Sequence, residues 1–180
     1  MTKFKDKFEK EVVKKLMDRL NIKNRLACPR VLKIVINTSM KDFLTDKKNI
    51  ERAKEDLALI TGQTPKIARA RVSVATFKLR EGDEIGLSVT LRGNRMYDFL
   101  EKLIKIVFPR VRDFAGVATK AFDGRGNLSV GFTENTVFPE IDPGKVDKIR
   151  TLQVTIATNA GDNEKGKVLL EEMGFPFKKS

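Results

Sequence analysis

The chain has 180 residues, of which 41% are hydrophobic and 33% charged, a balance that can build a buried core and excludes a disordered tail. Its formal net charge of +12 favours a polyanionic partner, first nucleic acid and second an anionic membrane surface. It has no histidine and a single cysteine, Cys28, which excludes an intramolecular disulfide and histidine-based catalysis and argues against a zinc site.

The amino-terminal region predicts an amphipathic helix over residues 4–20. Its apolar side chains recur every four residues, at Phe4, Phe8, Val12, Leu16 and Leu20. Acids on the outer face argue against a cationic membrane anchor: Asp6, Glu9, Glu11 and Asp18. Because the chain shows neither an apolar signal core nor a bilayer-spanning run, we expect the protein in the cytoplasm.

A strand is predicted over residues 30–39, because apolar and polar side chains alternate there. Its apolar face carries Leu32, Ile34 and Ile36, and its other face carries Lys33, Val35 and Asn37. The following helix begins at a capping residue, Thr45 or Asp46, and ends at Gly62. Its apolar positions are Ile50, Ala53, Leu57 and Ile60.

After a short strand ending at Ala68, we expect a long exposed loop around residues 70–84. The segment from Gln63 to Arg80 contains no acid and five basic residues: Lys66, Arg69, Arg71, Lys78 and Arg80. Phe77 adds a ring that could stack on a base. Long loops in compact domains are usually functional, so a phosphate-binding role is favoured over a simple solvated loop.

The remainder of the chain alternates strands and helices. A strand over residues 87–91 precedes a helix that carries Met96, Phe99, Leu100, Leu103 and Val107 and ends at Pro109. Residues 123–126 read as a hairpin turn, or as a loop that enters the strand at Leu128, Val130 and Phe132. A loop over residues 136–147 leads to a last strand over residues 151–159, and Asp162 can cap a final helix with Val168, Leu169 and Met173.

These elements predict an α+β fold in one domain over residues 1–180: a mostly antiparallel sheet with helices packed on one face and an open polar face. The open face would carry Lys33, Asn37, Thr90 and Gln153. Lysine can neutralise phosphates, and amides and hydroxyls can bind the 2′-hydroxyl or a base edge, so this face suits RNA. Ordinary solvent-facing strand residues remain the alternative.

No catalytic or cation-binding motif is apparent. The turn at residues 123–126 lacks the Gly-Lys-Ser/Thr of a phosphate loop and precedes a strand rather than a helix. Cys28 has no neighbouring base, and the acids at residues 81–84 and 140–142 do not have calcium-loop spacing. An RNA-acting enzyme would need a general acid or base, and no paired-carboxylate spacing supplies one. We therefore predict a non-enzyme without cofactor or metal.

Several segments together resemble the bacterial ribosomal protein L-five family, the 5S-rRNA-binding family of the large ribosomal subunit. They occur in the family's order over nearly the whole chain. The matching stretches are Glu11–Met17, Pro29–Asn37, Thr61–Pro65, Val89–Gly93, Pro109–Phe114, Phe122–Asn127, Phe138–Asp142 and Phe175–Phe177.

The resemblance implies a ribosomal location and a set of contact residues. The 5S rRNA would bind Lys33, Asn37, Gln63, Thr64, Thr90 and Arg92. The loop that reaches P-site tRNA would use Arg69, Arg71, Lys78 and Arg80. A bridge to the small-subunit head, through protein S-thirteen, would use Arg110, Arg112, Asp113, Glu134, Glu140 and Asp142. Further implied partners are 23S rRNA and neighbouring 5S-associated proteins. A free-standing regulatory RNA-binding protein remains the second hypothesis.

Overall fold

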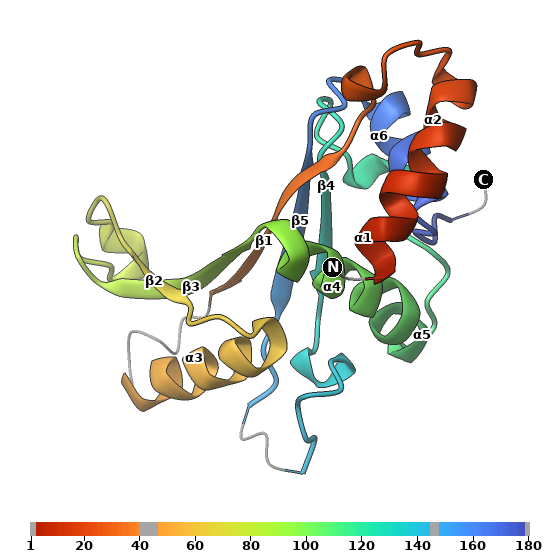
Figure 1. Ribbon diagram of the computed structural model, residues 1–180. Coiled ribbons are helices and arrows are strands. Elements are labelled where there is room, and N and C mark those ends of the chain that lie inside the picture. The colour runs from red at the N-terminus through yellow and green to blue at the C-terminus, as the bar shows by residue number, and fades with distance from the viewer. Residues whose placement is uncertain (1–2, 40–46, 145–147, 179–180) are drawn as a thin grey trace. The chain divides into compact units, whose positions relative to one another are not determined.

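The computed structural model describes residues 3–39, 47–144 and 148–178, and these confirm the α+β class (Figure 1). Their strands form a five-stranded sheet in the order β2-β3-β1-β5-β4. The strands are β1 (Val31–Ser39), β2 (Lys66–Arg69), β3 (Glu84–Leu91), β4 (Leu128–Phe132) and β5 (Leu152–Thr158). The helices are α1 (Lys3–Lys7), α2 (Val13–Leu20), α3 (Lys47–Thr61), α4 (Gly93–Lys102), α5 (Phe108–Arg110) and α6 (Asn163–Glu172).

The sheet is antiparallel, as the alternating strand faces predict. β2 pairs antiparallel with β3. At one end of the β1–β5 pair, the hydroxyl of Thr38 donates to the carbonyl of Thr151. At the other end, the backbone N–H of Asn159 donates to the carbonyl of Arg30. The end of β1 therefore meets the start of β5, which is the antiparallel arrangement.

The chain divides into two compact units. Unit 1 contains Met1–Ile34, Leu91–Val130 and Thr155–Ser180, and unit 2 contains Val35–Thr90 and Gly131–Val154. Each piece of unit 2 thus lies between pieces of unit 1 in the sequence. The single domain expected from the sequence stays a prediction, and the two units are described separately below.

In unit 1, the first predicted helix contains a π-helical turn. α1 and α2 flank a π-helical segment over Phe8–Val12. The predicted apolar face is buried at Phe4, Phe8, Val12 and Leu16. In a regular α-helix, each step of four residues rotates the side chain by about 40° beyond a full turn. In an α-helix, residues at a strict four-residue spacing would therefore rotate away from the buried face. A π-helical turn, closed by i→i+5 bonds, has more residues per turn and so keeps the repeat on the buried face.

The same adjustment occurs between α4 and α5, which flank a π-helical segment over Leu103–Val107. Phe99, Leu103 and Val107 are again four residues apart, and all three are buried. Pro109 lies next to the last residue of this continuous helical stretch, which ends at Arg110, one residue after the predicted end. The predicted helix is therefore present, with a π-helical turn that the apolar pattern did not reveal.

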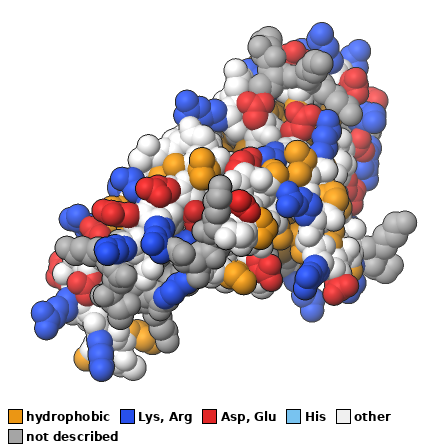
Figure 2. Space-filling view, turned by 90° about the horizontal axis from the view of Figure 1, so that it is seen from below, with side chains coloured by type: hydrophobic (Ala, Val, Ile, Leu, Met, Phe, Trp, Pro, Cys, Tyr) orange, Lys and Arg blue, Asp and Glu red, His pale blue; other side chains and the backbone are white. Residues whose placement is uncertain are grey.

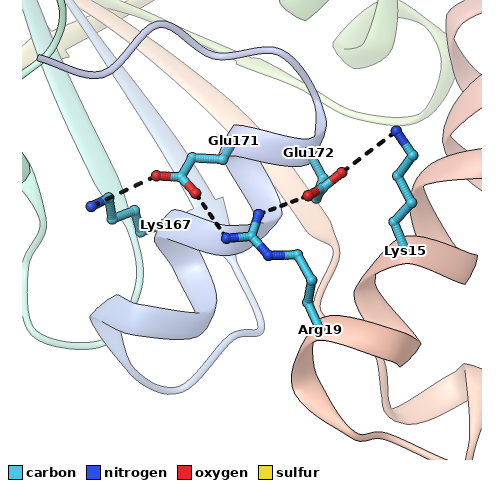
Figure 3. A network of polar contacts seen from close by, with 5 residues as sticks. All are labelled: Lys15, Arg19, Lys167, Glu171 and Glu172. Carbon is cyan, nitrogen blue, oxygen red and sulfur yellow. Dashed lines mark hydrogen bonds and ion pairs between the residues drawn. The ribbon is translucent and has the colours of Figure 1, made fainter. Parts of the chain in front are cut away.

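Ion pairs connect α2 to α6 (Figure 3). Arg19 Nη1 lies 2.7 Å from Glu172 Oε1, and its Nη2 lies 3.3 Å from Glu171 Oε2. Lys15 and Lys167 extend the network, at 3.8 Å to Glu172 and 3.6 Å to Glu171. The hydrogen bond to Glu172 is the main cause of the raised pKa of Arg19. Because partly exposed pairs stabilise little, we infer that the network chiefly fixes the orientation of the two helices.

The predicted turn at residues 123–126 is a hairpin turn that packs on the start of α6. Asn163 Oδ1 accepts hydrogen bonds from the backbone N–H groups of Gly124 (2.9 Å) and Gly126 (3.2 Å). A Cβ on Gly126 would lie 2.6 Å from the carbonyl oxygen of Asp162. Glycine is therefore required at this position by both space and backbone conformation.

In α6 the predicted cap is confirmed, because Asp162 Oδ1 accepts a hydrogen bond from the backbone N–H of Lys165 at 2.7 Å. That hydrogen bond is the main cause of the lowered pKa of Asp162. Leu169 and Met173 are buried as expected, and so is Leu170, while Val168 is half-buried.

In unit 2, α3 buries its predicted apolar face, which carries Ile50, Ala53, Leu57 and Ile60. Gly62 follows the helix with a φ of +66°, as expected of a glycine that ends a helix. The predicted caps, Thr45 and Asp46, lie outside the described residues. β2 and β3 are present as predicted, although β3 begins at Glu84 rather than at Leu87.

One predicted apolar position is wrong. Leu32 is 46% exposed, whereas Ile34 and Ile36 are fully buried. Val31 is buried, but it lies on the opposite face, because neighbouring strand residues point to opposite faces. On the face that carries Leu32, Ile34 and Ile36, burial begins at Ile34, so Leu32 contributes an apolar side chain to the surface.

Candidate RNA interface

In unit 2, two strands and the end of α3 present predicted RNA-binding residues. Asn37 on β1 and Thr90 on β3 are half-buried and alternate with fully buried neighbours, so both lie on the polar side of their strands. Because β1 and β3 are adjacent in the sheet and each buries its other side, we infer that their polar sides share one face. Thr64 is exposed directly after Gln63.

Gln63 is held against β3. Its Nε2 donates to the carbonyl oxygen of Thr90 at 3.4 Å. Its backbone N–H donates to the hydroxyl oxygen of Thr61 at 3.3 Å, and that hydroxyl donates in turn to the carbonyl of Leu57. The side-chain hydrogen bond uses an N–H group of the Gln63 amide, so the amide oxygen can accept from a ribose hydroxyl.

The two predicted phosphate-binding residues belong to unit 1. Lys33 lies on β1, half-buried and on the same side of the strand as Asn37. Arg92 is exposed in extended backbone immediately before α4. On β5, Gln153 is exposed as predicted for a polar strand face. Cations and amides thus occur on the polar sides of the strands, which is where the sequence pattern predicted them.

The predicted tRNA-contacting loop, expected around residues 70–84, occupies residues 70–83 between β2 and β3 and is ordered by its own hydrogen bonds. Val74 and Leu79 exchange backbone bonds of 2.9 and 3.1 Å. Ser73 Oγ accepts from the N–H of Glu81, and Asp83 Oδ2 accepts from the N–H of Arg80. The loop is therefore a folded extension of the β2–β3 hairpin, which its irregular sequence did not indicate.

This loop exposes its cations. Arg69 pairs with Glu84 at 3.3 Å at the base of the loop. Arg71, Lys78 and Arg80 are exposed and form no ion pair within the described residues. Phe77 is exposed beside them, so the loop combines positive charge with a ring that could stack.

The predicted bridge residues are all exposed and divide between the units. Arg110, Arg112 and Asp113 belong to unit 1; Glu134, Glu140 and Asp142 belong to unit 2.

The unit 1 segment that carries bridge residues is fixed by aromatic packing. Phe114 stacks on Phe108 with ring centroids 4.8 Å apart, and Phe108 contacts Phe175 edge to face at 4.9 Å. Val117 also bridges Phe177 in parallel pairing. The segment Arg110–Gly116 is thus held between α5 and the carboxy-terminal segment.

Unit 2 also contains a buried ionic cluster that the sequence did not predict. Arg150 Nη1 lies 2.5 Å from Asp56 Oδ2, and the backbone N–H of Arg150 donates to Asn135 Oδ1 at 3.3 Å. Asn135 Nδ2 also donates to Asp56 at 3.4 Å. The cluster ties the segment that carries Glu134 and Glu140 to α3. No local pattern signalled it, because Asp56 and Arg150 are far apart in the sequence.

Figure 2 shows lysine and arginine side chains interspersed with carboxylates over the face it presents. Within the described ranges, no group of acids or cysteine is placed to hold a metal ion. Cys28 is buried, and burial raises the pKa of its thiol, so it stays protonated and unreactive. None of the described helices is both long and apolar enough to span a bilayer.

Polar strand faces, a folded loop with exposed cations and a net charge of +12 are typical of an α+β protein that associates with nucleic acid. The comparisons specify the family. Residues 24–80 match the family model of ribosomal protein L5, and residues 84–177 match the model of the carboxy-terminal part of the same ribosomal family. The large ribosomal subunit protein uL5 of Leuconostoc mesenteroides is 50% identical over 175 residues, which cover 97% of each chain.

The chain belongs to the ribosomal protein L5 family. Members of this family are non-enzymatic, and the chain is a structural constituent of the large ribosomal subunit. The resemblance inferred from the sequence and the prediction of a non-enzyme are therefore both confirmed.

Proposed function

We propose that this constituent of the large ribosomal subunit binds 5S rRNA through the polar residues of β1 and β3. The observation that carries the proposal is the arrangement of Asn37, Gln63 and Thr90, in which Gln63 is already hydrogen-bonded to β3. Because the Gln63 amide is already held by this hydrogen bond, it can bind a 2′-hydroxyl or a base edge with little further loss of side-chain entropy. Lys33 and Arg92 would neutralise phosphates of the same RNA.

The loop at residues 70–83 would contact P-site tRNA, since it presents exposed cations and Phe77 on a folded support. The segments that carry Arg110 and Glu140 would bridge to protein S-thirteen of the small-subunit head. The remaining basic surface would contact 23S rRNA and neighbouring 5S-associated proteins, in keeping with the net charge of +12.

A gel-shift titration against 5S rRNA tests the central proposal, with tRNA as competitor at two salt concentrations. We expect binding to 5S rRNA that survives the tRNA competitor, with a salt slope that reports the number of phosphates neutralised. Equal and salt-sensitive binding to both RNAs would reduce the protein to a generic basic surface.

Two substitutions test the strand residues. Asn37→Ala and Thr90→Ala should each weaken 5S rRNA binding by about 1–2 kcal/mol, the effect of losing one hydrogen bond to a charged or buried partner. Thr133→Ala, an exposed threonine of the same unit, is the matched control. If both variants bind like the control, the strand face does not contact the RNA.

The loop is tested separately with Arg80→Ala. If the loop serves tRNA, this variant should bind free 5S rRNA with nearly wild-type affinity. A large loss of 5S rRNA affinity would show that the loop belongs to the 5S surface instead.

A further inference from the structure

A surface cavity of about 670 Å³ in unit 1 lies outside every predicted contact residue. Buried side chains from α1–α2, β1 and α4 form its apolar floor: Phe8, Val13, Val31, Met96 and Tyr97. Its volume falls within the range of roughly 300–1,000 Å³ that is typical of sites for organic ligands. Two exposed leucines also line it, Leu26 at 84% and Leu32 at 46%.

The charged side chains that line the cavity are mostly positive. Three cationic residues line it, Lys5, Arg25 and Arg30, together with one carboxylate, Glu9. Arg25 Nη2 donates to the carbonyl of Glu9 at 3.1 Å, which holds the guanidinium in place and leaves its other N–H groups for a ligand. Arg30 is held through its backbone, because its N–H donates to Asn159 Oδ1 at 2.6 Å. The cavity therefore favours an anionic ligand.

Tyr97 gives the floor an aromatic surface and a hydrogen-bond donor. It is the single tyrosine of the chain, and its ring lies 5.7 Å from that of Phe8. Burial and the charge of Glu9 raise the pKa of Tyr97, while Arg30 lowers it. The net effect is a hydroxyl that stays protonated at neutral pH and can donate to a base edge.

We propose that this cavity takes one unpaired nucleobase of a bound RNA, with the adjoining phosphates on Lys5, Arg25 and Arg30. Unpaired bases are the parts of RNA that proteins stack on aromatic and apolar side chains and fix by hydrogen bonds. The inference rests on the proposed function in one respect, that the partner is RNA. The cavity is continuous with that function, because Leu32 and Gly93 line it and adjoin Lys33 and Arg92 in the chain.

Methionine methyl groups provide a direct test on the full chain. Met96 lies on the cavity floor, and its NMR signal in protein with isotope-labelled methionine methyl groups can be assigned with Met96→Leu. We expect AMP and UMP to shift the Met96 signal, because a stacked base changes its magnetic environment, whereas ribose 5-phosphate and inorganic phosphate leave it in place. Equal shifts with ribose 5-phosphate would indicate an anion site only, and no shift with any probe would exclude ligand entry; either result overturns the proposal.

A blocking variant connects the cavity to RNA. Leu26→Glu places a carboxylate at a highly exposed position of the cavity lining, and Leu59→Glu is the matched control on α3, where Leu59 is 62% exposed. Leu26→Glu should abolish the nucleotide-induced shift of Met96 and raise the Kd for 5S rRNA roughly tenfold, the loss of about one base stack. The control should change neither.

The outcomes separate the two proposals. Tight 5S rRNA binding that is identical in Leu26→Glu and wild type would remove the cavity from the RNA interface and leave the proposed function standing. A Met96 response to AMP in a protein that fails to bind 5S rRNA specifically would support the cavity and overturn the proposed function.

Discussion

Arg150 is the most deeply buried charged residue of unit 2 among those described, with a side chain only 5% exposed. Its partner Asp56 is 25% exposed, so the pair is shielded from solvent mainly on the arginine side. Arg150 Nε is buried without a hydrogen-bond partner within the described residues, which leaves the guanidinium dependent on Asp56 and its neighbours.

We predict that Asp56→Ala lowers the free energy of unfolding by roughly 3–5 kcal/mol, because it leaves a buried charge uncompensated. Urea denaturation measures this change. Glu101→Ala is the matched control, since Glu101 pairs with Lys105 on an exposed helix surface and should contribute less than about 1 kcal/mol. Similar small losses in both variants would show that Arg150 finds another partner.

The hydrogen bonds to the Asp123 carboxylate predict a specific effect of pH on folding stability. The side-chain amide of Asn127, followed by the backbone N–H of Arg125, holds the pKa of Asp123 below its ordinary value. Its folded pKa is thus lower than its unfolded pKa. The carboxylate therefore contributes stability that is fully present above the unfolded value, near pH 4, and is lost as pH falls through the folded value.

Asp123→Asn should accordingly lose less stability than wild type as the pH falls below about 4. Urea midpoints measured across this range provide the test. Asp18→Asn removes the same charge at an exposed position on α2 and is the matched control. If the acid dependence of Asp123→Asn equals that of the wild type, the hydrogen bonds to Asp123 do not persist in solution.

At the scale of elements, the contact between the hairpin turn and α6 depends on close backbone approach. Gly126 has a φ of +82° and would place a Cβ 2.6 Å from the carbonyl of Asp162; Gly124 has a φ of +89° and nothing within 4 Å of its added Cβ. The two glycines share a backbone conformation and differ in the space around them.

Gly124→Ala should therefore lower stability by about 1–2 kcal/mol, the penalty of the left-handed conformation alone. Gly126→Ala should lower it by clearly more, because the turn must also move away from α6. Thermal unfolding of the two variants gives the comparison. Equal losses would mean that the turn can separate from α6 without penalty.

The pattern of apolar residues predicted most helices and strands, because burial of one face sets their periodicity. It predicted the buried residues Ile50, Leu57 and Val107, for example, and the cap at Asp162. It did not predict the π-helical turns or the order of the 70–83 loop. The signal for the π-helical turns was the strict four-residue spacing itself, which was interpreted as the ordinary helical period. The order of the loop depends on hydrogen bonds that the sequence pattern does not encode, such as the one that Ser73 Oγ accepts from the N–H of Glu81.

At the scale of the whole molecule, the net charge of +12 determines how RNA binding responds to salt. Lys33→Ala should weaken 5S rRNA binding and reduce the slope of log Kd against log salt by about 0.7–0.9, because one phosphate contact is lost. Asn37→Ala should weaken binding without changing the slope. Salt titrations of the two variants provide the test. If both variants showed the same slope, the assignment of Lys33 to a phosphate contact would be wrong.

Residues of the candidate interface could be predicted from the sequence only where they belong to a strand with alternating apolar and polar side chains. Asn37 and Thr90 follow from alternation, so their polar face was expected. The Asp56–Arg150 pair and the cavity around Tyr97 join segments that are distant in the sequence. Such long-range contacts are set by the tertiary fold, so one sequence read locally contains no signal for them.

The interleaving of the two units has a consequence for biosynthesis. Unit 2 ends at Val154, but the α2–α6 ion pairs of unit 1 join residues far apart in the sequence; Arg19 and Glu172, for example, are 153 positions apart. At a translation rate of about 5–20 residues per second, α2 waits roughly 8–30 s for its partner helix. Helix α2 thus leaves the ribosome that makes it long before α6 is synthesised. During this interval the face of α2 that packs against α6 has no partner, and a chaperone can cover it.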